Sequence, residues 1–164
     1  MSHSTLRNFF LVAPMIYAAT GRLAVQNYKP AQLKALKETQ KRFRKAVQTH
    51  DAEALALENN RFHELMGEMA ANPYLQASLG RLLIDHCRIG HTFFRPQNED
   101  MEQRLQLAAD HHDAFIAAIE ARDEQAVVDL VFEHWELSRV NMEIFIAPQG
   151  LKADHLIQTP EGNR

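Results

Sequence analysis

The chain has 164 residues, enough for one domain with a sizeable hydrophobic core and too few for a second domain of ordinary size. Its formal net charge of −3 at pH 7 excludes the broad basic surface that nucleic-acid binding requires. The single cysteine, Cys87, excludes an internal disulfide and suits a reducing cytoplasm. We therefore expect a one-domain cytoplasmic protein that does not bind DNA by itself.

The first segment is an apolar run at residues 9–19, which follows Arg7 and so imitates the start of a secretory signal peptide. Pro14 interrupts this run, and the positive charge before it is small. No stretch reaches the roughly 18–20 uninterrupted apolar residues of a membrane span. We favour a packed first helix from about Leu6 to Gln26, without membrane contact.

Five further helices are predicted, because glycine and proline are few and the segments between them repeat apolar residues with a helical period. Their expected ranges are 30–48, 51–71, 73–94, 101–121 and 123–147. Pro30 and Pro73 suit the first turn of a helix, and Asp51 is a suitable N-cap. The fold class is therefore predicted as all-α, an antiparallel bundle of about six helices over residues 1–147. The polar residues 148–164 are predicted to form a flexible tail.

Several polar side chains fall within the apolar faces of these helices. At about 100° per residue, His63 lies at the edge of its core-facing stripe, beside Asn59. His112 and His134 lie in the middle of the stripes of the last two helices. Their midpoint is Asp123, in the turn between those helices. An antiparallel pair therefore brings both rings to the same height, about 16 Å from the turn.

Two more polar residues, His86 and Asn141, also point inward by this count, whereas His111 points to the side. We expect four other histidines at the surface: His3, His50, His111 and His155. A buried imidazole is costly unless it is hydrogen-bonded or bound to a metal. Two interpretations stay open at this point, a structural polar cluster and a metal site, of which the first is commoner. The Glu-x-x-His pairs of a di-iron site are absent from the sequence.

The sequence around these residues resembles a known domain family. The resemblance depends on four pieces: Asn59-x-x-Phe62-His63, Ala71-Asn72-Pro73, His112-x-x-Phe115-Ile116-x-Ala118-Ile119-x-x-x-Asp123, and Ala126 with His134. Together they resemble the FCD domain, the effector-binding C-terminal domain of FadR-like transcription regulators in the GntR family. The resemblance covers residues 8–146, and its most specific feature is the step of 22 residues between the last two histidines.

The resemblance implies an antiparallel bundle with a central cavity, where a divalent metal ion helps to hold a small carboxylate effector. It implies His63, His112 and His134 as metal ligands, with Asn59 at the position where the family has an aspartate. An amide oxygen is a weaker ligand than a carboxylate and brings no charge, so this position departs from the family pattern. Three imidazoles favour Zn²⁺, with Ni²⁺ or Mn²⁺ as alternatives.

His86 and Asn141 are the further contacts that we expect for the effector. Family members have a winged helix-turn-helix ahead of this domain, whereas here the resemblance begins close to Met1. We therefore expect no DNA-binding domain within the chain, and DNA contact only through a domain outside it. The chain is then part of a longer regulator, which we favour, or a stand-alone sensor.

Such regulators are usually dimers, which predicts a homodimer formed through the early helices. The apolar residues of the first helix that could contribute to this interface are Phe9, Phe10, Met15 and Tyr17. For these four residues we favour a place in the core instead.

The predicted function is a metal-dependent sensor of a small organic carboxylate in a transcription regulator, and not an enzyme. Two alternatives stay open. Three histidines and an open fourth position on zinc also describe a hydrolase or hydratase, but the mapped faces hold no general base, and Asp85 lies only at the edge of its stripe. A purely structural bundle, in which the polar cluster fixes the core register, is the second alternative.

Overall fold

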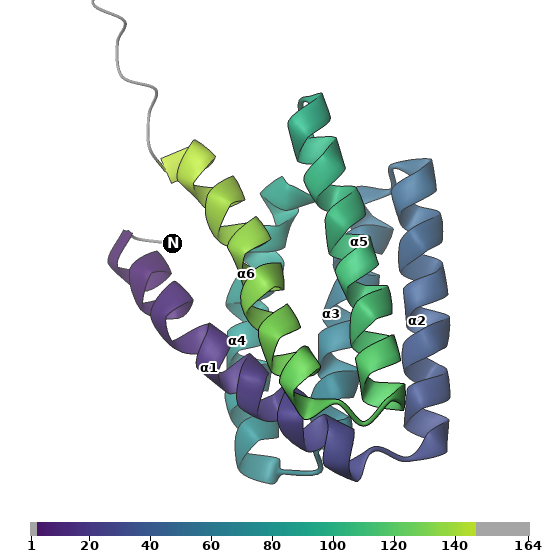
Figure 1. Ribbon diagram of the computed structural model, residues 1–164. Coiled ribbons are helices and arrows are strands. Elements are labelled where there is room, and N and C mark those ends of the chain that lie inside the picture. Colours follow the sequence, from purple (N-terminus) through teal and green to yellow (C-terminus); the bar gives the residue numbers. More distant parts are fainter. Residues whose placement is uncertain (1–2, 147–164) are drawn as a thin grey trace, which may run out of the picture.

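The computed structural model describes residues 3–146, with side chains described for 5–141. These residues form six α-helices and no strand (Figure 1): α1 (His3–Asn27), α2 (Pro30–Thr49), α3 (Ala52–Ala70), α4 (Pro73–Phe93), α5 (Glu99–Glu120) and α6 (Glu124–Ile146). The predicted all-α bundle of six helices is confirmed. The tail predicted at residues 148–164 lies outside the described residues.

Local sequence signals determine most of the helix ends. Asp51 and Asn72 act as N-caps, because their side chains accept hydrogen bonds from backbone N–H groups in the first turns of α3 and α4. Two boundaries differ from the prediction by more than one residue. α1 begins at His3, three residues early. α5 begins at Glu99, two residues early, because Asn98 caps it in the same way. Arg122 adopts a left-handed conformation with φ 58°, which ends α5 and reverses the chain into α6.

The helices pack so that α3 lies beside three others, α1, α2 and α4. α1 also packs along α6, and α2 packs along α5 (Figure 1). Buried apolar residues form two clusters, a larger one that includes Phe62 and a smaller one around Phe43. The ring of His112 lies against both of these phenylalanines. The polar centre of the molecule is therefore found where the two apolar clusters meet.

α1 packs against other helices of the bundle as an integral part of the fold. By length and composition alone, Thr5–Asn27 is apolar enough to cross a membrane, a property that core helices share. Three residues on one face, Ala13, Tyr17 and Ala24, are 0–6% exposed because α3, α4 and α6 cover them. This burial agrees with a packed first helix. Of the four apolar residues for which we favoured a place in the core, Phe9 and Tyr17 are core residues and Phe10 is partly buried. The prediction was wrong for Met15, which is 66% exposed because it lies on the face of α1 that no other described helix covers.

The contact between α1 and α6 requires a glycine. A Cβ atom added at Gly21 would lie 2.6 Å from Cγ1 of Val127, which is completely buried. At Gly80, on α4, an added Cβ atom meets no described atom within 4 Å. The two glycines therefore differ only in what surrounds them.

We predict that Gly21→Ala lowers the free energy of unfolding by about 1–3 kcal/mol, because the α1–α6 contact becomes overpacked. The matched variant Gly80→Ala is expected to raise it by about 0.5–1 kcal/mol, because alanine is the better helix former. Urea unfolding followed by circular dichroism measures both changes. A Gly21→Ala variant as stable as Gly80→Ala would show that α1 and α6 do not pack in this way.

Candidate functional site

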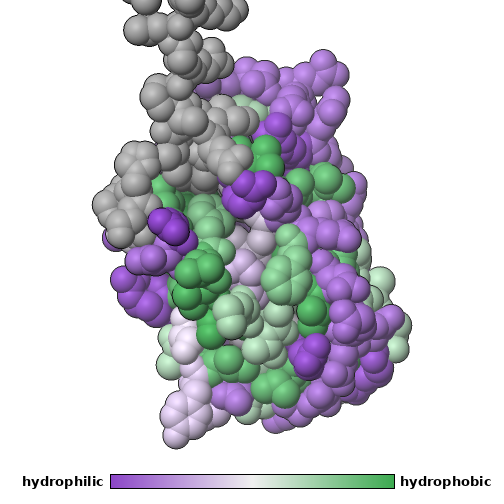
Figure 2. Space-filling view, turned by 60° about the vertical axis from the view of Figure 1, so that its left-hand side comes forward, coloured by the Kyte–Doolittle hydropathy of each residue, from purple (hydrophilic) through white to green (hydrophobic). Residues whose placement is uncertain are grey.

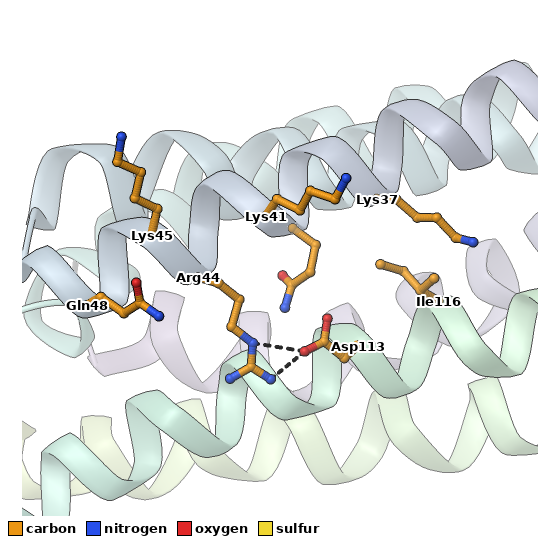
Figure 3. A pocket seen from close by; sticks show the side chains of 8 residues that line it. Lys37, Lys41, Arg44, Lys45, Gln48, Asp113 and Ile116 are labelled. Carbon is orange, nitrogen blue, oxygen red and sulfur yellow. Dashed lines mark hydrogen bonds and ion pairs between the residues drawn. The ribbon is translucent and has the colours of Figure 1, made fainter.

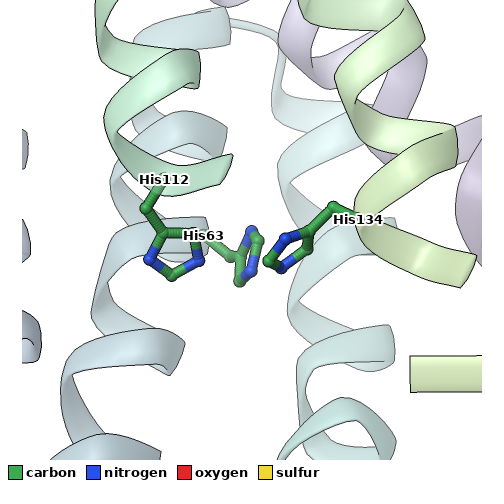
Figure 4. Close-up of side chains that lie close together, drawn as sticks. All are labelled: His63, His112 and His134. Atoms are coloured by element: carbon green, nitrogen blue, oxygen red, sulfur yellow. The ribbon is translucent and has the colours of Figure 1, made fainter. Parts of the chain in front are cut away.

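Three histidines from three helices meet inside the bundle (Figure 4). His63 comes from α3, His112 from α5 and His134 from α6, and all three are buried, with 0–6% exposed. One nitrogen atom of each ring lies within 4.8 Å of the others, and the ring centroids are 5.1–5.7 Å apart. The α5–α6 turn brings His112 and His134 side by side, as their spacing around that turn predicts. We call these three residues the histidine cluster.

Each ring of the histidine cluster has a buried nitrogen atom without a hydrogen-bond partner in the described part of the chain. These atoms are Nε2 of His63, Nε2 of His112 and Nδ1 of His134. Such atoms are rare in folded proteins, because burial removes their hydrogen bonds to water and the lost bonds cost free energy. Three of them in one cluster form a donor set that a metal ion satisfies.

Burial keeps these rings neutral. Loss of hydration lowers the pKa of His112 to about 3 and the pKa of His86 to about 4. The same desolvation, with a smaller contribution from the neighbouring imidazoles, lowers the pKa of His63 and of His134 well below the ordinary value. At pH 7 all four rings are therefore uncharged, the form in which an imidazole binds a metal ion.

Two helices outside the histidine cluster orient buried imidazoles. Oε1 of Gln40, on α2, lies 3.1 Å from Nδ1 of His112. The hydroxyl group of Tyr17, on α1, lies 2.8 Å from Nδ1 of His86. Sequence reasoning missed both partners. Gln40 interrupts the apolar stripe of its helix between Leu36 and Phe43, and that interruption was the signal that could have identified it.

The structure places His86 with the cluster, with its ring centroid 5.0 Å from that of His63. Asn59 lines the same small void as His86 and His134. Asn141 is buried but lies two helical turns beyond His134, about 10 Å along α6. Its amide nitrogen is 3.5 Å from the hydroxyl oxygen of Thr92. The predicted site residues therefore come together, except for Asn141.

One surface prediction was wrong. His111 is half-buried, its ring centroid is 5.6 Å from that of His134, and its Nδ1 atom is buried without a partner among the described residues. The helical angle correctly turns it away from the centre, but α6 packs against that side of α5 as well. His50 is exposed, as predicted. The side chains of His3 and His155 lie outside those described.

Two small voids adjoin the histidine cluster. Tyr17, His63 and Trp135 line one of them, and Asn59 and His86 line the other. In each void, the volume that the centre of a water molecule can occupy is only about 10 Å³, which is room for one water. The central cavity is thus narrow in this structure. A carboxylate fits beside the cluster only if helices or side chains move apart.

A larger groove, of about 440 Å³, lies on the surface between α2 and α5 (Figure 3). Four cationic side chains line it, but three of them already pair with carboxylates: Lys37 with Glu120, Lys41 with Glu38, and Arg44 with Asp113. Paired, exposed charges of this kind attract a further anion only weakly. We therefore assign the functional site to the histidine cluster rather than to this groove.

Comparison with known proteins identifies the family of the chain. The family model of the FCD domain matches residues 15–137, which is most of the chain and includes the whole histidine cluster. The chain belongs to the FCD domain family. FCD domains are the ligand-sensing, regulatory domains of GntR-family transcription regulators, so the resemblance seen in the sequence is confirmed.

Among solved structures, this FCD domain is similar to Escherichia coli McbR/YncC, a GntR-family regulator, with a TM-score of 0.76. The two share 17% sequence identity, and the match covers 88% of this chain and 67% of that chain. At this identity the likeness shows a common fold and nothing more specific. A search of curated proteins found no match.

The buried histidines predict a loss of stability in acid. Their pKa values in the folded chain lie below the 6.5 of a free imidazole, so the unfolded chain binds more protons below that pH. We predict that the metal-free protein loses about 1 kcal/mol per pH unit for each ring that stays neutral, as the pH falls from about 6.5 toward 5. Urea unfolding in the presence of a chelator measures this. A constant free energy of unfolding between pH 7.5 and 5 would contradict the burial of neutral rings.

Proposed function

We propose that this FCD domain is a metal-dependent sensor of a small organic carboxylate, and that it acts in a cytoplasmic regulator of transcription. The observation that supports this most strongly is the histidine cluster, three buried neutral imidazoles whose inward nitrogen atoms have no hydrogen-bond partner among the described residues. His63, His112 and His134 would hold the metal. When bound, the metal supplies a Lewis acid with open positions for a carboxylate oxygen.

The residues fit a single metal ion. Nitrogen atoms that share one zinc ion, at about 2.0–2.1 Å each, lie at most about 4.2 Å apart. Those of the histidine cluster lie within 4.8 Å, so small ring rotations bring them into range. We propose Zn²⁺, with Ni²⁺ or Mn²⁺ as alternatives, because the donors are neutral nitrogen atoms. Asn59 is the proposed weak oxygen ligand, since it lines a void together with His134.

The effector would occupy the space that the two narrow voids mark. His86 is the proposed effector contact, because it lines one void and the Tyr17 hydroxyl group holds its ring. An effector that also reaches Asn141 must extend about 10 Å along α6. Helices α3, α4, α5 and α6 all border the void of His86, so an occupant larger than water moves one of these helices or the side chains that line the void. Effector binding thereby favours a different helix packing, which is how the signal would leave the site.

The two alternatives have less support. Asp85, the carboxylate considered as a general base, pairs with Arg81 and Arg88 on α4, and no carboxylate of the described residues belongs to the histidine cluster. We therefore expect no enzymatic turnover. A purely structural cluster would leave three buried nitrogen atoms unpaired, at about 1–3 kcal/mol each. Metal binding removes that cost.

We predict that His112→Ala lowers the affinity for Zn²⁺ by more than about 100-fold, because a ligand is lost. The control His91→Ala changes an exposed histidine of α4 and is expected to bind zinc like the unchanged protein. Competition with a coloured chelator measures both affinities.

With zinc bound to the unchanged protein, calorimetry against dicarboxylates and hydroxycarboxylates is expected to show saturable binding that His112→Ala abolishes. A protein that binds zinc but none of these acids would keep its metal site and lose the sensor function.

An apolar surface supports the proposed homodimer. Leu11 and Met15 of α1 are 70% and 66% exposed, and Phe132 of α6 is 51% exposed. All three line a shallow groove of about 300 Å³ between these helices. The space-filling view shows apolar side chains gathered on the face that includes α1 (Figure 2). Exposed apolar surfaces of this kind mark interfaces between proteins, and we propose that a second copy covers this one.

We predict that Met15→Glu makes the protein monomeric, because it places a charge in the proposed interface. Leu57→Glu, at a leucine of α3 that is 67% exposed and lies away from this groove, is the matched control and should leave the dimer intact. Size-exclusion chromatography with light scattering gives both masses. A monomer before any substitution, or dissociation by both changes alike, would rule out this interface.

A further inference from the structure

Gln40, on α2, makes two hydrogen bonds to α5 with one side-chain amide. Its Oε1 atom lies 3.1 Å from Nδ1 of His112, and its Nε2 atom donates to the backbone carbonyl oxygen of Ala109 over 2.8 Å. The two partners are one helical turn apart on α5. Gln40 is only 3% exposed, so water does not replace either bond. Both ends of the amide are therefore held in place.

These two bonds decide which nitrogen atom of His112 has the proton. A backbone carbonyl only accepts hydrogen bonds, so the NH₂ group of Gln40 must face Ala109 and its oxygen atom must face His112. That oxygen atom also only accepts, so Nδ1 of His112 must be the donor. A neutral imidazole has one proton to donate. The lone pair is therefore on Nε2.

Nε2 is the atom of His112 that the proposed metal site needs. It is buried and has no hydrogen-bond partner among the described residues. Figure 4 shows the ring of His112 turned toward His63 and His134. The ring of Phe62 stacks flat on it, with centroids 4.0 Å apart and planes 4° apart, which restricts rotation. With the other tautomer, a proton would lie where the metal binds.

Ion pairs hold α2 against α5 on both sides of Gln40. One turn earlier, Lys37 pairs with Glu120. One turn later, Arg44 pairs with Asp113, as the dashed lines of Figure 3 show. Each exposed pair is weak by itself. Together they favour the register of the two helices in which the amide reaches its two partners.

We propose that Gln40 is a positioning residue of the metal site, which fixes His112 as the Nδ1–H tautomer and directs its Nε2 lone pair into the histidine cluster. The inference rests on the proposed metal site, since outer partners of metal-bound histidines select the tautomer in this way. Gln40 is neutral, and Asn59 is neutral where the family has an aspartate. The charge of a divalent metal would therefore stay uncompensated by these residues, which favours an anionic ligand such as a carboxylate.

Long-range ¹H–¹⁵N correlation spectra of the metal-free protein test this directly, because they distinguish the two tautomers. We expect His112 as the Nδ1–H form in the unchanged protein. Gln40→Met keeps the size of the side chain but replaces the acceptor oxygen by a weakly accepting sulfur atom, so His112 should no longer be held in that form. Gln40→Glu loses the donor to the carbonyl group of Ala109 but keeps an acceptor oxygen for His112, so His112 should keep the Nδ1–H form. Gln48→Met makes the same substitution at an exposed position of α2 and should change nothing.

Zinc affinity gives the second readout. It should fall about 10–100-fold in Gln40→Met and stay constant in Gln48→Met. An Nε2–H tautomer in the unchanged protein, or an unaltered tautomer in Gln40→Met, would overturn the role of Gln40. If Gln40→Met does not fold, the tautomer of the unchanged protein still decides. Because the tautomer is read without metal, a protein that binds no zinc refutes the proposed function separately from this inference.

Discussion

Burying an imidazole removes its hydrogen bonds to water, and this bundle buries four that contact one another through their rings: His63, His86, His112 and His134. The fold has to satisfy them from inside. Tyr17 of α1 serves His86 and Gln40 of α2 serves His112, so helices that contribute no ring to the histidine cluster still contribute a hydrogen bond to a buried imidazole. The four imidazoles thus form the centre on which the packing of all six described helices converges.

The tight burial of the histidines also connects binding of the proposed effector to the packing of the helices. The voids beside the cluster hold about one water each, so the interior has no preformed room for a carboxylate. Close-packed interiors do not deform continuously, so the proposed effector would shift side chains or helices from one arrangement to another. The helices that border the void of His86 include α6. α6 also packs against α1, the helix that has the exposed apolar residues of the proposed dimer interface. A change at the centre thereby has a direct route to the proposed dimer surface.

The charges at the histidine cluster agree with the proposed sensor function. The three imidazoles of this cluster are neutral at pH 7, and no carboxylate of the described residues belongs to it. The acid Asp85 is held by two arginines on its own helix. A donor set of this composition is the one that we propose for a metal ion.

The sequence by itself determined the six helices and the inward direction of four histidines, because helical period and capping residues act over a few residues. It also determined the pairing of His112 with His134, since a short turn makes their height a matter of counting. Only the tertiary structure decided that Gln40 and Tyr17 support the site, that His111 lies against α6, that Asn141 stands apart from the cluster, and that the cavity is narrow. Those facts depend on which helices become neighbours and how closely they pack. A local pattern such as the break in the apolar stripe at Gln40 shows that a polar side chain faces inward, but not which residue some 70 positions away it contacts.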